Sequence, residues 1–234
     1  KKIAKKIVRD RNKKIINTSY MPKALIFDFD GLIVDTETVI YESWAEIYEQ
    51  NGQILELNTY KNCVGSDFEQ FHPGIELEKR TGKKFDWTII DTEREELIRQ
   101  QLEQKKERTG IRHFIETAKE KGLELAIASS SSRNWVSGWI TKLGLREYFS
   151  TLVNRDDVQK IKPDPELFLK ACDSLGISPS ESLLFEDSEN GLKAATAAGI
   201  SCAIITNPIT AGGNFTGAIM VAESFTDERL KKLF

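Results

Sequence analysis

Short runs of apolar residues recur along the chain, and stretches with helical spacing of apolar residues separate many of them. Each run is about three to six residues long and stops at a turn or a polar cluster, as buried parallel strands do. Strands are expected at residues 24–27, 123–128, 151–153, 182–185, 202–205 and 218–221. Helices are expected at residues 135–143, 163–175 and 191–198. This alternation predicts an α/β fold, a doubly wound parallel sheet with right-handed crossovers.

Residues 39–106 interrupt the alternation and have a helical pattern. Apolar side chains first recur at intervals of three and four residues until Asn51-Gly52, a helix stop. Two further helical pieces are expected, at residues 68–80 and 87–104. We therefore predict a helical domain of residues 39–106, inserted into a core made of residues 21–38 and 107–234.

Composition is that of a globular protein, with 40% hydrophobic and 29% charged residues. The sequence contains neither a transmembrane-length apolar stretch nor the apolar core of a signal peptide. Cys63, Cys172 and Cys202 are odd in number and widely spaced, which suits reduced thiols. We expect a soluble, cytoplasmic monomer without a membrane partner.

Residues 1–20 differ from the rest in charge, with eight basic residues and one acidic residue. The remainder carries a formal charge of −10, against −3 for the whole chain, so we expect no nucleic-acid partner. The basic leader could form an amphipathic helix on a membrane or nucleic acid. We favour a solvated tail or an extension, with the catalytic domain beginning at Met21-Pro22.

Four clusters of polar side chains follow predicted strands, three of them directly and one after a loop. They are Asp28 and Asp30, Ser129 and Ser130, Lys162, and Glu186 and Asp187. Because parallel strands end at one edge of the sheet, these groups are expected to converge. Four carboxylates would repel one another, and a bound cation would relieve that repulsion. Oxygen ligands without His or Cys favour Mg²⁺.

Each cluster also has an ordinary structural explanation. Asp28 and Asp30 could simply form a turn, the serine run could cap a helix, and Lys162 could precede a helix start. Glu186-Asp187 could be the acidic opening of a helix. The occurrence of all four clusters in this order favours a joint catalytic role over these separate structural explanations. Lys162 and Ser129 suit a phosphate group, and a carboxylate nucleophile would divide phosphoryl transfer into two steps.

With these motifs, the chain resembles the haloacid dehalogenase superfamily over roughly residues 22–230, in its phosphatase and β-phosphoglucomutase-like branch with a helical cap. Asp28-Phe29-Asp30-Gly31 is similar to the first motif, Ser129 to the second, Lys162 to the third and Glu186-Asp187-Ser188 to the fourth. The resemblance implies a Rossmann-like core, with residues 39–106 as the cap. Linkers near residues 35–38 and 105–110 would let this cap open and close.

The resemblance also implies a role for each motif. Asp28 would be the nucleophile and Asp30 the acid and base, while Ser129, Ser130 and Lys162 would hold the phosphoryl group. Asp28, the main-chain carbonyl of Asp30 and Asp187 would hold Mg²⁺, with Glu186 nearby. The expected function is hydrolysis of a small phosphorylated metabolite, such as a sugar phosphate, through an aspartyl phosphate.

Two positions depart from the phosphomutase pattern. Ile40 stands where β-phosphoglucomutases carry a His, and Gly65-Ser66-Asp67-Phe68 lacks their Arg. Both departures favour a phosphatase over the alternative, a β-phosphoglucomutase-like sugar phosphomutase. We expect neither His72 nor His113 to be catalytic.

Other interpretations of the sequence are less well supported. A signalling receiver uses a similar Asp, Mg²⁺, hydroxyl and Lys, but the long insertion after the first strand argues against it. A metal-free dehalogenase would not require Asp30 and Glu186-Asp187. Trp135 and Trp139 have helical spacing that favours core packing over stacking on a ligand, whereas Trp44 and Trp87 fall in the insertion and could reach a substrate.

Overall fold

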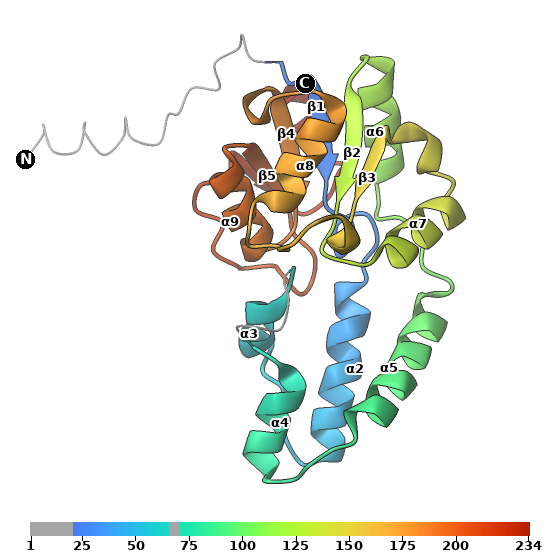
Figure 1. The fold of residues 1–234 in the computed structure, drawn as a ribbon, viewed down its shortest axis with the longest axis vertical. Helices are drawn as coiled ribbons and strands as arrows, with labels where there is room; N and C mark the ends of the chain where they lie inside the picture. The colour runs from blue at the N-terminus through green and yellow to red at the C-terminus, as the bar shows by residue number, and fades with distance from the viewer. Residues whose placement is uncertain (1–20, 66–70) are drawn as a thin grey trace, which may run out of the picture.

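The computed structural model describes residues 21–65 and 71–234, and within them the chain forms a six-stranded sheet (Figure 1). The strands are β1 (Ala24–Phe27), β2 (Glu124–Ala128), β3 (Thr151–Val153), β4 (Ser182–Glu186), β5 (Ser201–Ile205) and β6 (Met220–Ala222). Their order across the sheet is β3-β2-β1-β4-β5-β6, and each neighbouring pair is parallel. The fully buried β1 therefore lies at the centre, between β2 and β4.

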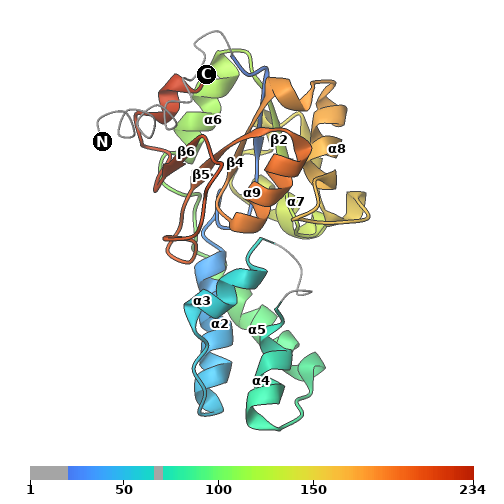
Figure 2. The same ribbon diagram turned by 90° about the vertical axis from the view of Figure 1, so that its left-hand side faces the viewer.

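Helices cover both faces of this sheet. They are α6 (Ile111–Glu120), α7 (Arg133–Lys142), α8 (Glu166–Leu175) and α9 (Glu189–Ala198). Alternate β1 residues face opposite layers, so Leu25 and Phe27 pack in one core with α6 and α7, while Ile26 packs in another with α8 and α9. Figure 2 shows α6 on one side of the sheet and α8 on the other. The predicted α/β fold and doubly wound parallel sheet are confirmed.

A second group of helices lies beyond the carboxyl ends of the strands (Figures 1 and 2). It consists of α2 (Glu37–Gln50), α3 (Leu57–Tyr60), α4 (Pro73–Thr81) and α5 (Trp87–Leu102), with a 3-10 turn at Lys61–Cys63. These helices share a hydrophobic cluster that includes Trp44, Tyr48 and Leu77. Side chains cap two of them, because His72 Nδ1 accepts main-chain N–H groups at the start of α4 and the Asp86 carboxylate does so for α5.

The apolar pattern located the regular elements to within a few residues. The exceptions are α6, where no helix was predicted although its buried apolar residues have helical spacing, and α3 and the short 3-10 turns, which leave no periodic signal. Three predictions lie outside the described residues: that for residues 1–20, the start of the expected helix at residues 68–70, and the missing mutase Arg at Ser66-Asp67-Phe68. In the described ranges, every helix lacks either the length or the apolar character that a membrane crossing demands.

The two connections between the sheet and the second group of helices run side by side. Val34 forms an antiparallel bridge with Glu107, and Arg108 N donates to Ile33 O at 2.8 Å. The Arg108 guanidinium then donates to main-chain carbonyls from three separate segments. These are the carbonyls of Gly31, Ile205, Thr206 and Glu223, at 2.5–3.2 Å. One side chain therefore joins the turn after β1 to the ends of β5 and β6.

We predict that Arg108→Met lowers the free energy of unfolding by about 2–3 kcal/mol, because it leaves several carbonyls without their donor. Urea denaturation followed by circular dichroism measures this loss. Arg99→Met is the matched control. The Arg99 side chain is 73% exposed and pairs with Glu96, so its loss should leave the free energy of unfolding nearly unchanged. Equal losses in the two variants would contradict the structural role of Arg108.

Candidate active site

Three buried carboxylates meet where β1 and β4 end. Phe27 pairs with Phe185 across these strands, which places Asp28 beside Glu186, the last residue of β4. Asp187 follows directly. One oxygen from each of the three carboxylates lies within 4.8 Å of the others, and each residue is at most 3% exposed. The sheet register therefore concentrates negative charge at one point.

Lys162 supplies a buried positive charge to this acidic cluster. Its ammonium lies 2.5 Å from Asp28 Oδ1 and 2.7 Å from Glu186 Oε1, and its side chain is 1% exposed. The two carboxylates raise the pKa of Lys162 against the opposing effect of burial, so the ammonium stays charged. The residue lies nine positions beyond the end of β3, so a loop carries it back to the strand ends.

Glu186 is held by donors on both of its oxygens. While Oε1 accepts from Lys162, Oε2 accepts the main-chain N–H groups of Asp187 and Ser188 at 2.8 Å and the Ser188 hydroxyl at 2.9 Å. That hydroxyl also accepts from Gly191 N and caps α9. A Cβ on Gly191 would lie 1.9 Å from the Glu186 carboxylate, so this approach requires glycine.

Asp187 has one satisfied oxygen and one without a partner. Asn207 Nδ2 donates to Oδ2 at 2.6 Å, and the same amide donates to Gly31 O at 3.2 Å. The buried Oδ1 has no hydrogen-bond partner among the described residues. Burial, followed by the charges of Glu186 and Asp28, raises the Asp187 pKa well above its usual value. An open carboxylate oxygen inside an acidic cluster fits a hard divalent cation.

The same forces act on two neighbouring carboxyl groups. Burial raises the pKa of Asp28 to about 7, although Lys162 opposes the shift. Burial and the Asp30 and Asp28 charges raise the pKa of Glu37, at the start of α2, to about 8. Without a cation, this region therefore favours protonated carboxyl groups.

Asp30 belongs to a separate hydrogen-bond group on the α7 side of β1. Its Oδ1 accepts from Thr36 Oγ1 and from Trp135 Nε1, each at 2.9 Å. Its Oδ2 accepts from Ser131 Oγ at 2.6 Å and from Ser129 Oγ at 3.4 Å. The turn that begins at Asp30 thus gives its carboxylate a different set of partners from those of Asp28.

The serine run distributes its hydroxyl groups among different partners. Ser129 is 1% exposed and lies beside Asp30, as does Ser131. The Ser130 hydroxyl donates to Gly65 O at 3.3 Å, toward the second group of helices. Phosphate binding by Ser130 stays a prediction, and Ser131 is a direct partner of Asp30 that the sequence interpretation missed.

The site also includes residues that were not predicted from the sequence, among them Thr36, which donates to Asp30. Asn207 follows β5, so the rule that selected polar residues after strands could have found it. Ser131 stood within the selected hydroxyl run. Trp135 packs against the core as predicted, but its indole N–H also binds Asp30. The helical spacing of Trp135 carried no sign of that hydrogen bond.

The second group of helices contacts the rim of the site. Asn190 Nδ2 donates to Val64 O at 2.9 Å, and Lys61 Nζ donates to Ala211 O at 2.7 Å. A Cβ on Gly65, which has a φ of 74°, would lie 2.3 Å from Ser188 Oγ. Gly65 is therefore closely fitted to the start of α9.

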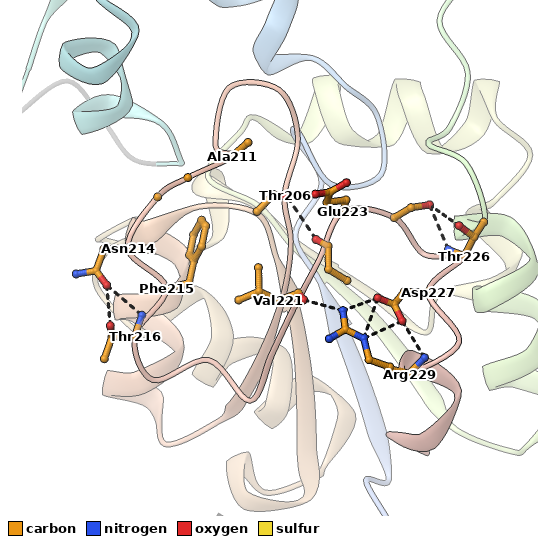
Figure 3. Close-up of a pocket in the computed structure, with 14 residues that line it drawn as sticks. Thr206, Ala211, Asn214, Phe215, Thr216, Val221, Glu223, Thr226, Asp227 and Arg229 are labelled. Atoms are coloured by element: carbon orange, nitrogen blue, oxygen red, sulfur yellow. Dashed lines mark hydrogen bonds and ion pairs between the residues drawn. The ribbon is translucent and has the colours of Figure 1, made fainter. Parts of the chain in front are cut away.

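A separate surface cavity of about 830 Å³ lies beside β6 and the loop that follows β5 (Figure 3). The seven predicted site residues do not line it. Figure 3 shows Arg229 directed toward Asp227, and the two form a salt bridge within this cavity. The acidic cluster, rather than this cavity, therefore holds the candidate chemistry.

Comparison with known proteins identifies the family. A family model described as haloacid dehalogenase-like hydrolase matches residues 25–205. A Bacillus subtilis protein named "Putative phosphatase YhcW" is 44% identical over 190 residues, covering 81% of this chain and 86% of that protein. A Thermotoga maritima protein named "Phosphorylated carbohydrates phosphatase" is 32% identical over 178 residues, covering 76% and 82% of the two chains.

A solved structure agrees in fold. CbbY from Rhodobacter sphaeroides, determined in complex with phosphate, matches with a TM-score of 0.68 and 26% identity, covering 88% of this chain and 96% of that one. The family resemblance predicted from the motifs is thus confirmed. The chain belongs to the haloacid dehalogenase-like hydrolase family.

Proposed function

We propose that this protein is a Mg²⁺-dependent phosphatase that hydrolyses a small phosphorylated metabolite through an aspartyl phosphate. The observation that carries the proposal is the placement of Asp28. Its carboxylate contacts the ammonium of Lys162 and belongs to the acidic cluster, in which Asp187 Oδ1 has no partner among the described residues. Family membership and the names of the two relatives support the phosphatase class.

The residues present fit a magnesium site. Asp28, Asp187 and the main-chain carbonyl of Asp30 would hold the ion, with Glu186 nearby, as the family resemblance implies. Bound Mg²⁺ would neutralise the carboxylates and the charge on the transferring phosphoryl group. Lys162 and Ser129 would contribute further donors to the phosphoryl oxygens, as would Ser130.

Asp28 and Asp30 would carry out the two halves of the reaction. An Asp28 oxygen forms a bond to phosphorus while the bond from phosphorus to the leaving oxygen breaks, and Asp30 gives its proton to that oxygen. In the second half, Asp30 takes a proton from water as the water oxygen attacks the aspartyl phosphate. Release of inorganic phosphate then restores both carboxyl groups.

The helices between the two connections would form the cap of this enzyme. In this proposal the core comprises residues 21–38 and 107–234, and the cap comprises residues 39–106. The paired connections at Val34 and Glu107 would serve as its hinge. Contacts from Gly65 and Val64 to the rim support a cap that closes over the acidic cluster.

A phosphatase is favoured over the phosphomutase alternative by Ile40. This residue is apolar and partly buried at the cap position where the mutase pattern has a His. The Ile40 side chain cannot form a hydrogen bond to Asp30. A sugar phosphate is the substrate class that we propose, in line with the carbohydrate named for the Thermotoga relative.

A panel of a few dozen phosphorylated metabolites, assayed for phosphate release with Mg²⁺, tests this function. Hydrolysis of at least one sugar phosphate is expected. Release of phosphate from none of them would contradict the proposal. Conversion of β-glucose 1-phosphate to an isomer with a bisphosphate primer would instead favour the mutase.

Asp28→Asn should reduce turnover by at least about 10³-fold, because an amide is a poor nucleophile, while the fold is retained. Phosphate release by the purified variant and its circular dichroism spectrum give the two readouts. Asp173→Asn, at an exposed position of α8, is the control and should keep full activity. More than a tenth of the wild-type rate in Asp28→Asn would exclude Asp28 as the attacking group.

Magnesium should stabilise the protein more at pH 8 than at pH 5. Asp28 has a raised pKa of about 7 in the folded state, so the metal-free fold retains a proton that the unfolded chain has released above about pH 4. Metal-free stability therefore falls as pH rises from about 4 to 7, and a cation offsets the loss.

Thermal unfolding with EDTA or with saturating Mg²⁺ measures this effect. A rise in Tm of about 5–10 °C is expected at pH 8 for Mg²⁺ at one hundred times its Kd, and a smaller rise at pH 5. Asp187→Asn should lose most of the shift, whereas Asp173→Asn should keep it. The same Mg²⁺ shift in all three proteins would argue against metal binding at the acidic cluster.

A further inference from the structure

Trp135 combines a packing role with a polar contact. It lies in the first turn of α7, where its main-chain N–H donates to the helix-capping Ser132 Oγ at 3.4 Å. Its ring packs against the core that contains α6 and α7, with its centroid 6.0 Å from that of Trp139. The indole Nε1 donates to Asp30 Oδ1 at 2.9 Å. A rigid, packed ring thus directs one donor at the proposed acid and base.

The two oxygens of Asp30 have chemically different partners. The indole N–H at Oδ1 can donate but cannot accept. The second donor there, the Thr36 hydroxyl, accepts from Gly31 N at 3.2 Å while donating to Asp30. At Oδ2 the nearer partner is the Ser131 hydroxyl at 2.6 Å, which can rotate and either donate or accept. The Ser129 hydroxyl, at 3.4 Å, accepts from Ser131 N, as Thr36 accepts from Gly31 N. Oδ1 is therefore held by an indole N–H that can only donate, whereas Oδ2 has in Ser131 a partner that can change between donating and accepting.

We propose that Trp135 is a positioning residue, which together with Thr36 holds Oδ1 so that Oδ2 is the oxygen that exchanges protons with the substrate. This inference rests on the proposed function. As the bond from phosphorus to the leaving oxygen breaks and the bond to Asp28 forms, the proton moves from Oδ2 to the leaving oxygen. In the second half-reaction, water returns a proton to the same atom.

Leaving groups of different basicity separate this role from simple packing. An alkoxide leaving group needs a well-placed proton, whereas the weakly basic p-nitrophenolate needs one far less. Trp135→Phe keeps most of the ring and removes the N–H. Trp139→Phe is the matched control, one turn along the same helix, 8% exposed and packed in the same core.

The experiment compares kcat/KM for p-nitrophenyl phosphate with kcat/KM for the best sugar phosphate found in the metabolite panel. For Trp135→Phe we expect a loss of at least about tenfold on the sugar phosphate and less than about threefold on p-nitrophenyl phosphate. Trp139→Phe should affect both substrates equally and weakly. Asp30→Asn should show the same selective loss as Trp135→Phe, but a larger one.

The hydrogen bond itself has a readout that does not depend on activity. In a ¹H–¹⁵N spectrum, Asp30→Ala should shift the indole signal of Trp135 strongly and that of Trp139 little, with assignments from the two Phe variants. Two results would overturn the positioning role while Asp28→Asn remained inactive. One is an equal loss of kcat/KM on both substrates in Trp135→Phe, and the other is a Trp135 indole signal that Asp30→Ala leaves unchanged. Full activity in Asp28→Asn would instead overturn the proposed function.

Discussion

Repulsion among buried carboxylates is the constraint on which the rest of this structure depends. Asp28, Glu186 and Asp187 lie within one cation's reach of one another, and burial makes each uncompensated charge costly. Lys162 offsets part of that charge, and main-chain N–H groups hold Glu186. Among the described residues, Asp187 Oδ1 has no hydrogen-bond partner. The described side chains and main-chain groups therefore compensate the charge of the cluster only in part.

The turn after β1 divides the site into two hydrogen-bond groups. Asp28 lies with the two carboxylates at the end of β4, whereas Asp30 contacts the serine run and α7. Gly31 allows this division because it has a φ of 73°, and a Cβ there would lie 2.4 Å from Asp187 Oδ2. A side chain at this position would collide with the acidic cluster, so the local sequence and the chemistry require the same residue.

Hydrogen bonds also link the inserted helices to the edge of the candidate active site. Gly65 O accepts from the serine run, and Val64 O accepts from Asn190 in the first turn of α9. Arg108, where the second connection re-enters the core, binds the Gly31 carbonyl that also accepts from Asn207. The path of the chain into and out of the insertion is therefore linked to the hydrogen bonds around Asp187. If the inserted helices moved, they would do so about connections that these hydrogen bonds hold in place.

The sequence by itself determined the strands, the parallel sheet and most of the polar groups at its edge, because short apolar runs and the residues that follow them are local signals. It could not show that a loop returns Lys162 to β1, nor that Asn207 binds Asp187 and Trp135 binds Asp30. Those contacts join residues 20 to 134 positions apart. They depend on strand register, loop path and side-chain rotamers, which only tertiary packing decides.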